Sequence, residues 1–281
     1  KPYDYQIEGV EKLYNNYFFA LFDEMGLGKT IMCLMAIDKL VSENSNFKAL
    51  VICPKTLTKQ WDDMVSQFSD ITSQIIEGNK DKRMVHWAFS NLRQINITNY
   101  ETIRQDGQSK DYLWDLVVLD EASRIKNFFT KTSHSVKQLK AKRRWVLTGT
   151  PIENMLQDIY SIFNFVHPYI LGNWLSFRDN FLIWHREKIM SGYYPKEFTV
   201  YDGVKNIDLL KQQISNHYLR RTKSEVSLQL PPLVKQNIWV ELSPDEQIVY
   251  NEILKRFVDR FRTSKQSSLG LIQLMRVCCN G

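Results

Sequence analysis

The sequence contains few of the residues that mark several common protein classes. It has four cysteines (Cys33, Cys53, Cys278 and Cys279), and no two of them are spaced for zinc, so we expect a reducing compartment without disulfides or zinc. Glycine and proline number only 11 and 8, which excludes a collagen-like or low-complexity chain. No apolar run approaches the roughly 20 residues that span a bilayer, and no secretory signal follows the first residue. We therefore expect no membrane partner.

The composition that remains is that of a globular protein with a modest positive charge. The chain has 281 residues, 43% of them hydrophobic, which predicts one large domain or a domain with a sizeable insertion. The formal net charge of +6 fits either a polyanionic partner or a solvated surface with spare lysines. Frequent asparagine, isoleucine, lysine and tyrosine favour a bacterial or phage source and a cytoplasmic location, whereas a eukaryotic source implies the nucleus.

Short apolar runs alternate with helical patterns in the first half of the chain. Each run is closed by a polar or glycine-bearing turn, and runs of this kind are typical of buried parallel strands. The expected strands are residues 18–22, 49–53, 95–99, 116–119 and 145–148. This alternation predicts an α/β fold in which a parallel sheet is flanked by helices.

The pattern changes after Pro151. Residues 155–225 read as mostly helical, with a loop at 191–203 and aromatic residues whose spacing favours core packing over base stacking. A β-type run at 238–242, a helix from Pro244 to about Arg262 and a last short apolar helix follow. We expect an ATPase lobe at 1–154, a helical insertion at 155–232, and a return strand with a helical linker at 233–281.

A phosphate-binding loop is the strongest functional signal. Residues 23–30 read DEMGLGKT, between an expected strand and an expected helix. In such a loop the backbone N–H groups wrap the phosphates, here those of Met25, Gly26, Leu27 and Gly28. Lys29 is expected to reach the β- and γ-phosphates of ATP, and the Thr30 hydroxyl to hold Mg²⁺. Asp23 stands where the general pattern has glycine.

Two adjacent carboxylates end the expected strand at 116–119. Asp120 is expected to hold Mg²⁺ through water, and Glu121 to orient and deprotonate the attacking water. Together with Lys29, they form the expected catalytic set of a nucleotide hydrolase.

The wider set of motifs resembles the SWI/SNF-type branch of helicase superfamily two, whose members are ATP-driven translocases on double-stranded DNA. The resemblance implies a RecA-like P-loop NTPase fold, and DEMGLGKT is the usual phosphate loop of this branch. The motifs stand in order along nearly the whole chain: YQIEGV at 5–10, VICPKTL at 51–57 followed by Gln60 and Trp61, ITNYE at 97–101, LDEASRIKN at 119–127, LTGTPIEN at 147–154 and LRRTKSEV at 219–226.

The resemblance also implies roles for single residues. Gln6 is expected to read the adenine, and Ser123, Thr148 and Thr150 to couple the nucleotide site to DNA. Ser123 replaces the family's usual histidine, so we expect altered coupling but unaltered nucleotide binding. The expected DNA contacts are Lys55, Thr56, Lys59, Gln60 and Asn99. The first four of these follow the carboxyl end of a strand, where open α/β sheets bind ligands.

The family's second RecA-like lobe is a further expected partner. That lobe carries an arginine finger in a Gln-x-x-x-Arg-x-x-Arg pattern, and no glutamine here is followed by arginine at +4 and +7. We therefore expect the chain to be the first part of a longer motor. Arg220 and Arg221 are expected to brace the fold rather than to replace that arginine. A DNA-bound protein is a possible remodelling target.

Some alternatives remain open at this point. Residues 124–144 contain eight basic and no acidic side chains, which fits either a phosphate-binding surface or a solvated helix behind the sheet. The motor itself has two rivals, an RNA or single-strand helicase of the same superfamily and a nucleotide-gated DNA clamp without turnover.

Overall fold

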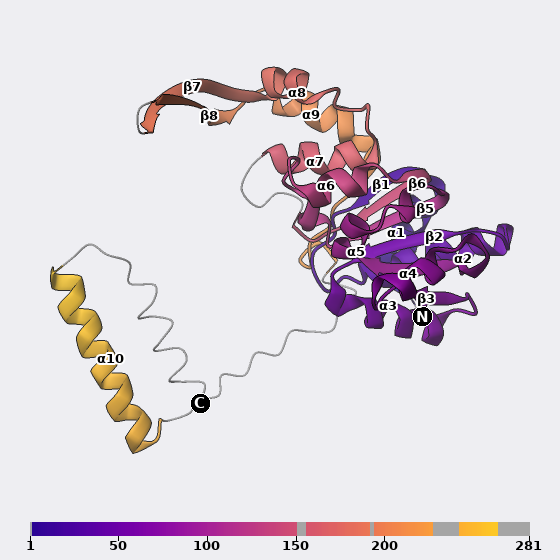
Figure 1. The fold of residues 1–281 in the computed structure, drawn as a ribbon, viewed down its shortest axis with the longest axis horizontal. Coiled ribbons are helices and arrows are strands. Elements are labelled where there is room, and N and C mark those ends of the chain that lie inside the picture. The colour runs from indigo at the N-terminus through magenta and orange to yellow at the C-terminus, as the bar shows by residue number, and fades with distance from the viewer. Residues whose placement is uncertain (1, 151–155, 192–193, 227–241, 264–281) are drawn as a thin grey trace. The chain divides into compact units, whose positions relative to one another are not determined.

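The protein is described by a computed structural model that covers residues 2–150, 156–191, 194–226 and 242–263 (Figure 1). It contains two compact units, residues 1–230 and 231–281, and each is described by itself. Among the helices that the structure describes, none has the length and apolarity needed to cross a membrane.

The larger unit is built on a seven-stranded sheet with the strand order β3-β4-β2-β5-β6-β1-β9. Every neighbouring pair in this sheet is parallel. Its strands are β1 (Phe18–Leu21), β2 (Ala49–Cys53), β3 (Ser73–Ile75), β4 (Ile95–Asn99), β5 (Leu113–Asp120), β6 (Lys140–Leu147) and β9 (Tyr218–Leu219). All five strands expected from apolar runs are confirmed, whereas β3 and β9 were not predicted.

Alternate residues of the central strands face opposite sides of the sheet, and a hydrophobic core lies on each side. Val51 and Val118 lie in the core with helices α1 (Asp4–Asn15), α2 (Lys29–Glu43) and α3 (Thr58–Phe68). Ile52 and Leu119, the next residues along β2 and β5, lie in the core on the other side. Helices α4 (Lys80–Trp87), α5 (Tyr100–Gln105), α6 (Lys131–Lys137) and α7 (Leu156–Val166) contribute to that second core. The period of two along a strand decides this division.

The insertion after the sheet contains a long β-hairpin, so the prediction of a mostly helical region with a loop at 191–203 was wrong. Helix α8 (Trp174–Phe181) leads directly into β7 (Leu182–Ser191), which pairs antiparallel with β8 (Tyr194–Val204), and α9 (Ile207–Ile214) follows. Figure 1 shows the hairpin projecting beyond α8 and α9. The described strand residues carry many charged side chains and no long apolar run, so cross-strand pairing rather than burial fixes them.

The aromatic residues of the insertion pack as a core, as predicted. Tyr160, Phe163 and Phe177 are nearly inaccessible to solvent. The ring centroids of Tyr160 and Phe177 lie 4.7 Å apart, and those of Tyr160 and Trp174 lie 5.1 Å apart. Tyr160, Phe163 and Phe177 are therefore core residues.

The described part of the second unit is helix α10 (Pro244–Thr263), as predicted. Ser243 and Glu246 form a capping box, in which the Glu246 N–H donates to Ser243 Oγ at 3.3 Å and the Ser243 N–H donates to Glu246 Oε2 at 2.8 Å. The expected strand at 238–242 lies outside the described residues except for residue 242. The expected last helix lies outside them as well, as do Cys278 and Cys279. Cys33 and Cys53 are buried, and burial raises the pKa of both thiols.

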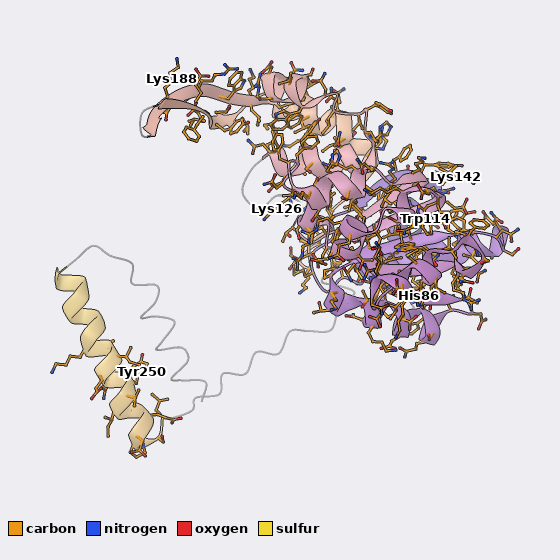
Figure 2. All side chains as sticks on the ribbon, in the orientation of Figure 1. His86, Trp114, Lys126, Lys142, Lys188 and Tyr250 are labelled. Atoms are coloured by element: carbon orange, nitrogen blue, oxygen red, sulfur yellow. The ribbon has the colours of Figure 1, made fainter. Side chains whose placement is uncertain are left out.

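The basic run at 124–144 does not form one surface, which answers the choice that the sequence left open. Figure 2 shows Lys126 and Lys142 at well-separated places on the domain. Lys142 pairs with Asp115 at 2.7 Å. Arg144 turns inward and donates to the carbonyl oxygens of Phe165 and Leu139. Several of these cations therefore stabilise the fold, and only part of the run is available to a partner.

Lys137 is a buried cation within this run. Its ammonium donates to Ser161 Oγ at 2.8 Å and lies 4.1 Å from the centroid of the Phe128 ring. Burial lowers the pKa of Lys137 to about 7. No carboxylate pairs with it among the residues that the structure describes.

We predict that this lysine makes stability depend on pH. Above pH 7 the native state has released the proton that the unfolded chain keeps up to its ordinary pKa of about 10.4. The unfolded state therefore binds more protons, and the free energy of unfolding rises with pH by up to ~1.4 kcal/mol per unit. Denaturant unfolding from pH 6.5 to 9 should show this rise in the wild type relative to Lys137→Met. Parallel curves for the two proteins contradict the assignment.

Candidate functional site

The phosphate loop joins the end of β1 to the start of α2. Gly26 and Gly28 have φ angles of 87° and 83°, in the left-handed region that glycine adopts without strain. Helix α2 begins at Lys29, so its first N–H groups and the loop amides face the same space. The local sequence therefore forms the anion cradle that it predicted.

Lys29 lies at the centre of this cradle. Its side chain is only 8% exposed, and its ammonium donates to the carbonyl oxygens of Asp23 at 2.8 Å and Glu24 at 3.3 Å. Burial lowers the pKa of Lys29, while the nearby carboxylates of Glu121 and Asp120 oppose that shift. The loop thus holds a partly desolvated cation beside two carboxylates.

The acidic pair lies at the end of β5, on the central strands of the sheet. Asp120 is 5% exposed, and burial raises the pKa of its carboxyl group. Glu121 has a φ angle of 51°, a left-handed conformation that costs a non-glycine residue about 1–2 kcal/mol. This turn ends the strand at the pocket, where both carboxylates lie. Strain at such a position is typical of functional sites.

Trp61 is a site residue that sequence reasoning did not identify. Its indole N–H donates to Asp120 Oδ2 at 2.8 Å, and the Glu121 N–H donates to Asp120 Oδ1 at 3.0 Å. Both carboxylate oxygens therefore have fixed donors, which orient the group. The motif at 51–61 contains this tryptophan, but sequence alone does not show that α3 packs against the end of β5.

The predicted catalytic residues converge on one pocket of about 410 Å³. Its lining includes Met25, Gly26, Gly28, Lys29, Thr30, Gln60, Trp61, Asp120 and Glu121. Amide donors, a cation and a short hydroxyl suit a polyphosphate, and the carboxylate and hydroxyl oxygens are ligands that Mg²⁺ prefers. The residues present therefore fit Mg·ATP.

Gln6 lies against the phosphate loop, on the helix α1 that precedes it. Its Nε2 donates to the Leu27 carbonyl at 3.4 Å, and its Oε1 accepts from the Tyr3 N–H at 3.0 Å. A Cβ atom at Gly28 would lie 2.6 Å from Gln6 Nε2, and the φ angle of 83° is strained for any residue but glycine. Leu27 itself is buried beside Tyr5 and Val226. Gln6 therefore contacts the loop, and its contact with adenine stays a prediction.

Arg221 explains why the loop begins with aspartate. Its guanidinium donates to both oxygens of Asp23, at 3.1 Å and 2.5 Å, and also to the Tyr5 carbonyl oxygen and to Glu8 Oε2. Asp23 is fully buried. Arg221 thus braces the loop and α1 from a segment about 200 residues later, as expected, and Arg220 is exposed.

The three expected coupling residues lie close to the loop and the acidic pair. Ser123 Oγ lies 3.5 Å from the Glu121 carbonyl, at the limit of a hydrogen bond. Thr148 is buried, and its Oγ1 accepts from the Thr150 N–H at 3.2 Å. Between the two threonines, a Cβ atom at Gly149 would lie 2.9 Å from Met25 Cγ. The turn at 148–150 therefore packs directly on the phosphate loop.

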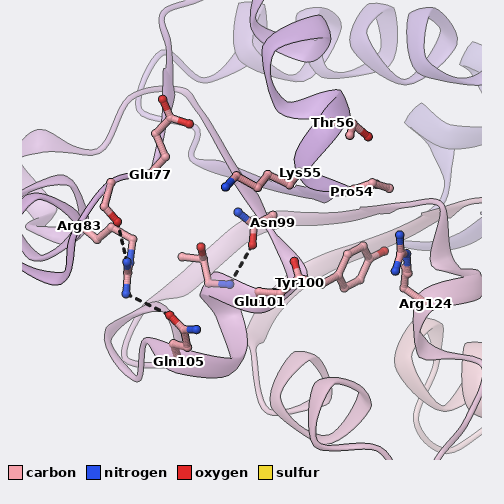
Figure 3. Close-up of a pocket in the computed structure, with 12 residues that line it drawn as sticks. Pro54, Lys55, Thr56, Glu77, Arg83, Asn99, Tyr100, Glu101, Gln105 and Arg124 are labelled. Atoms are coloured by element: carbon pink, nitrogen blue, oxygen red, sulfur yellow. Dashed lines mark hydrogen bonds between the residues drawn. The ribbon is translucent and has the colours of Figure 1, made fainter.

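A second hollow, of about 520 Å³, collects three of the predicted DNA contacts. We call it the Lys55 hollow; it lies at the carboxyl ends of β2 and β4 (Figure 3). Its lining includes Lys55, Thr56 and Asn99, together with Glu77, Arg83, Glu101, Gln105 and Arg124. Asn99 Oδ1 caps α5 by accepting from the Thr102 N–H at 2.9 Å.

The structure separates the other two predicted DNA contacts from this hollow. Gln60 lines the nucleotide pocket instead. Lys59 is exposed and pairs with Asp63 at 2.8 Å and Asp62 at 3.9 Å. Adjacent helical residues point about 100° apart, so one turn of α3 presents Lys59 and Gln60 to different surroundings.

The Lys55 hollow has little surplus positive charge. Arg83 is neutralised by Asp106, with its Nε and Nη2 at 2.7 Å and 2.8 Å from the two carboxylate oxygens. Lys55 and Arg124 then stand against the carboxylates of Glu77 and Glu101 in the lining. The net positive charge that the Lys55 hollow offers to a phosphate backbone is therefore small.

Comparisons with known proteins agree with this geometry. The SNF2-related domain family matches residues 5–281. An uncharacterized ATP-dependent helicase of Mycoplasma pneumoniae is 32% identical over 287 residues, covering 99% of this chain and 26% of the relative. The ISWI chromatin-remodeling complex ATPase ISW1 of Saccharomyces cerevisiae is 29% identical, covering 98% of this chain and 25% of the relative. The chain thus spans about a quarter of the length of these relatives.

A solved structure has the same fold. The Sulfolobus solfataricus SWI2/SNF2 ATPase core in complex with dsDNA superposes with a TM-score of 0.69 at 27% identity, covering 99% of this chain and 57% of the other. The expected RecA-like sheet flanked by helices is therefore confirmed.

We predict separate roles for Lys29 and Glu121. Lys29→Ala should weaken Mg·ATP binding by about 100-fold or more, because the pocket loses a charge-assisted contact to phosphate worth several kcal/mol. Glu121→Gln should retain binding within about threefold but abolish turnover, because an amide orients water without accepting its proton. Isothermal titration measures the Mg·ATP affinity of both variants, and an ATP hydrolysis assay measures their turnover. Equal loss of binding in the two variants contradicts separate roles.

We also predict that Trp61 positions Asp120. Trp61→Phe keeps an aromatic ring in α3 but removes the donor to Asp120, and a hydrogen bond to a charged group contributes ~1.5–3 kcal/mol. The Mg²⁺ concentration needed for half-maximal nucleotide binding should rise about tenfold. The matched control is Trp87→Phe, which removes an indole donor to Asp106 outside the pocket. A similar change in both variants would mean that the effect is general destabilisation.

Proposed function

The chain belongs to the SNF2-related domain family, and from this membership we propose that it binds Mg·ATP and hydrolyses it under stimulation by duplex DNA. In this proposal it is the first motor lobe of a double-stranded DNA translocase. Membership establishes an ATPase core of the helicase and chromatin-remodeller type. The observation that carries the finer proposal is the convergence of Lys29, Thr30, Asp120 and Glu121 on one pocket.

The chain's own groups divide the work of hydrolysis. The loop amides and Lys29 bind and orient the phosphates, and Asp120 and Thr30 hold Mg²⁺. When bound, the metal neutralises charge on the phosphate oxygens. Glu121 orients the attacking water and accepts its proton. Trp61 and the Glu121 N–H keep Asp120 aimed at the pocket.

Duplex DNA is the polymer along which we propose that the motor moves. The Sulfolobus solfataricus core was solved with dsDNA, and the Lys55 hollow lies at the sheet edge where ligands of open α/β sheets bind. A translocase needs contacts that repeat at every step, so we propose phosphate contacts without base readout. We also propose that the chain acts with a second RecA-like lobe that supplies an arginine finger, and that it moves a DNA-bound protein.

The test measures ATP turnover of this chain, alone and joined to the second lobe, without nucleic acid and with duplex DNA, single-stranded DNA or RNA. We expect slow turnover for the chain alone, because an arginine finger contributes ~10³–10⁵ in rate. Duplex DNA should stimulate the two-lobe protein most. Lys55→Glu should reduce the stimulation severalfold, and Lys59→Glu, already paired with Asp63, should change it little.

The rival functions give different results in the same assay. Equal or greater stimulation by single-stranded DNA or RNA favours the single-strand or RNA helicase. The clamp is favoured if DNA binding depends on nucleotide but the protein shows no ATP turnover that Glu121→Gln abolishes. In that case, Ser123→His is the variant that tests whether a histidine restores turnover. Comparable duplex-stimulated rates with and without the second lobe would contradict the two-lobe proposal and point to Arg220.

A further inference from the structure

A third hollow, of about 470 Å³, lies where helices α5 and α6 contact each other. We call it the Phe129 hollow, and its lining is Arg104, Phe128, Phe129, Thr130, Lys131, His134 and Ser135. None of the motifs quoted above assigns a role to these residues. Most of its lining residues come directly after the acidic motif in the sequence, because that motif ends at residue 127 and the lining continues from Phe128.

Phe129 is the most unusual member of this lining. Its side chain is 73% exposed, although a phenylalanine at the start of a helix gains stability only by burial. The ring is anchored at one side, with its centroid 5.3 Å from that of Phe128 and 5.9 Å from that of Trp174, both nearly edge-on. The aromatic core beneath therefore holds a ring whose outer part remains open to a ligand.

The charges around the ring have one sign. Arg104 and Lys131 are exposed, His134 stands beside them, and the lining includes no carboxylate. Within the described ranges, no acidic side chain lies within 4.0 Å of the cationic groups of Arg104 or Lys131. The Lys55 hollow, by contrast, sets two carboxylates against its two unpaired cations.

The two hollows adjoin along α5 and along the chain that follows the acidic pair. Glu101 and Gln105 of α5 line the Lys55 hollow, and Arg104 of the same helix lines the Phe129 hollow. Figure 3 shows Arg124 on the side of the Lys55 hollow away from Glu77 and Arg83. Arg124 also precedes the segment at 128–135 by only a few residues along the chain. The chain after the acidic pair therefore contributes first to the Lys55 hollow and then to the Phe129 hollow.

We propose that the Phe129 hollow is a second contact for the phosphate backbone of duplex DNA. Arg104 and Lys131 bind phosphate oxygens, and the open part of the Phe129 ring packs against the adjoining deoxyribose. The proposal rests on the duplex-binding function proposed above. It adds that the cations of the Phe129 hollow contribute more of the attraction to DNA phosphates than those of the Lys55 hollow. A cationic patch with an apolar centre matches a sugar–phosphate backbone, which alternates anionic and apolar groups.

The test is duplex affinity of the whole chain, measured by fluorescence anisotropy of a labelled duplex of arbitrary sequence over a range of salt. The target variant carries Arg104→Glu and Lys131→Glu together. Its charge-matched control carries Lys12→Glu and Lys211→Glu, two exposed lysines on α1 and α9 outside both hollows. We expect the target variant to lose about tenfold or more in affinity and to flatten the logarithmic salt slope by about two, since each phosphate contact contributes about one.

The control should lose much less affinity and keep the wild-type slope. Equal losses in the target and control variants would mean that net charge alone acts, and the proposal would be overturned. Phe129→Ala should weaken binding severalfold at an unchanged slope, because an apolar contact releases no counterions, whereas Phe129→Leu should lose less. Thermal unfolding by circular dichroism checks each fold, and the neutral pair Arg104→Gln with Lys131→Gln replaces the reversals if these unfold.

Failure of this proposal differs from failure of the proposed function. If the wild-type chain shows no salt-dependent duplex binding, the duplex-binding function itself fails. If Lys55→Glu weakens duplex binding and the target variant does not, the function stands and the Phe129 hollow is overturned as a DNA contact. If a polyglutamate peptide binds the wild type but not the target variant while duplex affinity is equal in both, the hollow binds an acidic protein instead.

Discussion

The buried ion pair between Arg221 and Asp23 is the interaction on which the nucleotide site depends. Asp23 is fully buried, and Arg221 is 9% exposed. Removing one partner of such a pair costs about 3–5 kcal/mol, because the other charge stays buried without compensation. The same guanidinium bonds the Tyr5 carbonyl oxygen, while the Glu24 N–H donates to the Arg221 carbonyl at 2.9 Å. The segment that follows the insertion therefore braces the phosphate loop.

This dependence separates what the sequence reveals from what it hides. Strands β2 and β4 were predicted residue for residue, and every residue in them is buried. Strand β3 is three half-buried residues, and β9 only two, so neither has a pattern of its own. Both exist because a neighbouring strand offers them hydrogen bonds. Tertiary pairing, rather than local preference, also fixes the hairpin of β7 and β8.

The same reasoning applies to the side chains of the candidate site. Lys29, Thr30, Asp120 and Glu121 were predictable, because each stands at the end of an element whose direction the motif determines. Gln60 and Trp61 were harder to place. Their direction depends on the rotation of α3 against the sheet, which brings the Trp61 indole to Asp120. Spacing along a helix gives the angle between two neighbours but not the surface that either one faces.

The main chain links the nucleotide pocket to the edge of the Lys55 hollow. A Cβ atom at Gly149 would lie 3.2 Å from Met25 N, so the turn at 148–150 lies in close contact with the phosphate loop. Glu121 holds a left-handed conformation, and the turn Ala122–Ile125 that follows leads to Arg124 at the edge of the Lys55 hollow. At 3.5 Å, the Ser123 hydroxyl adds little to this path. The acidic pair and the edge of the Lys55 hollow are therefore joined by a short stretch of backbone, whichever side chain stands at position 123.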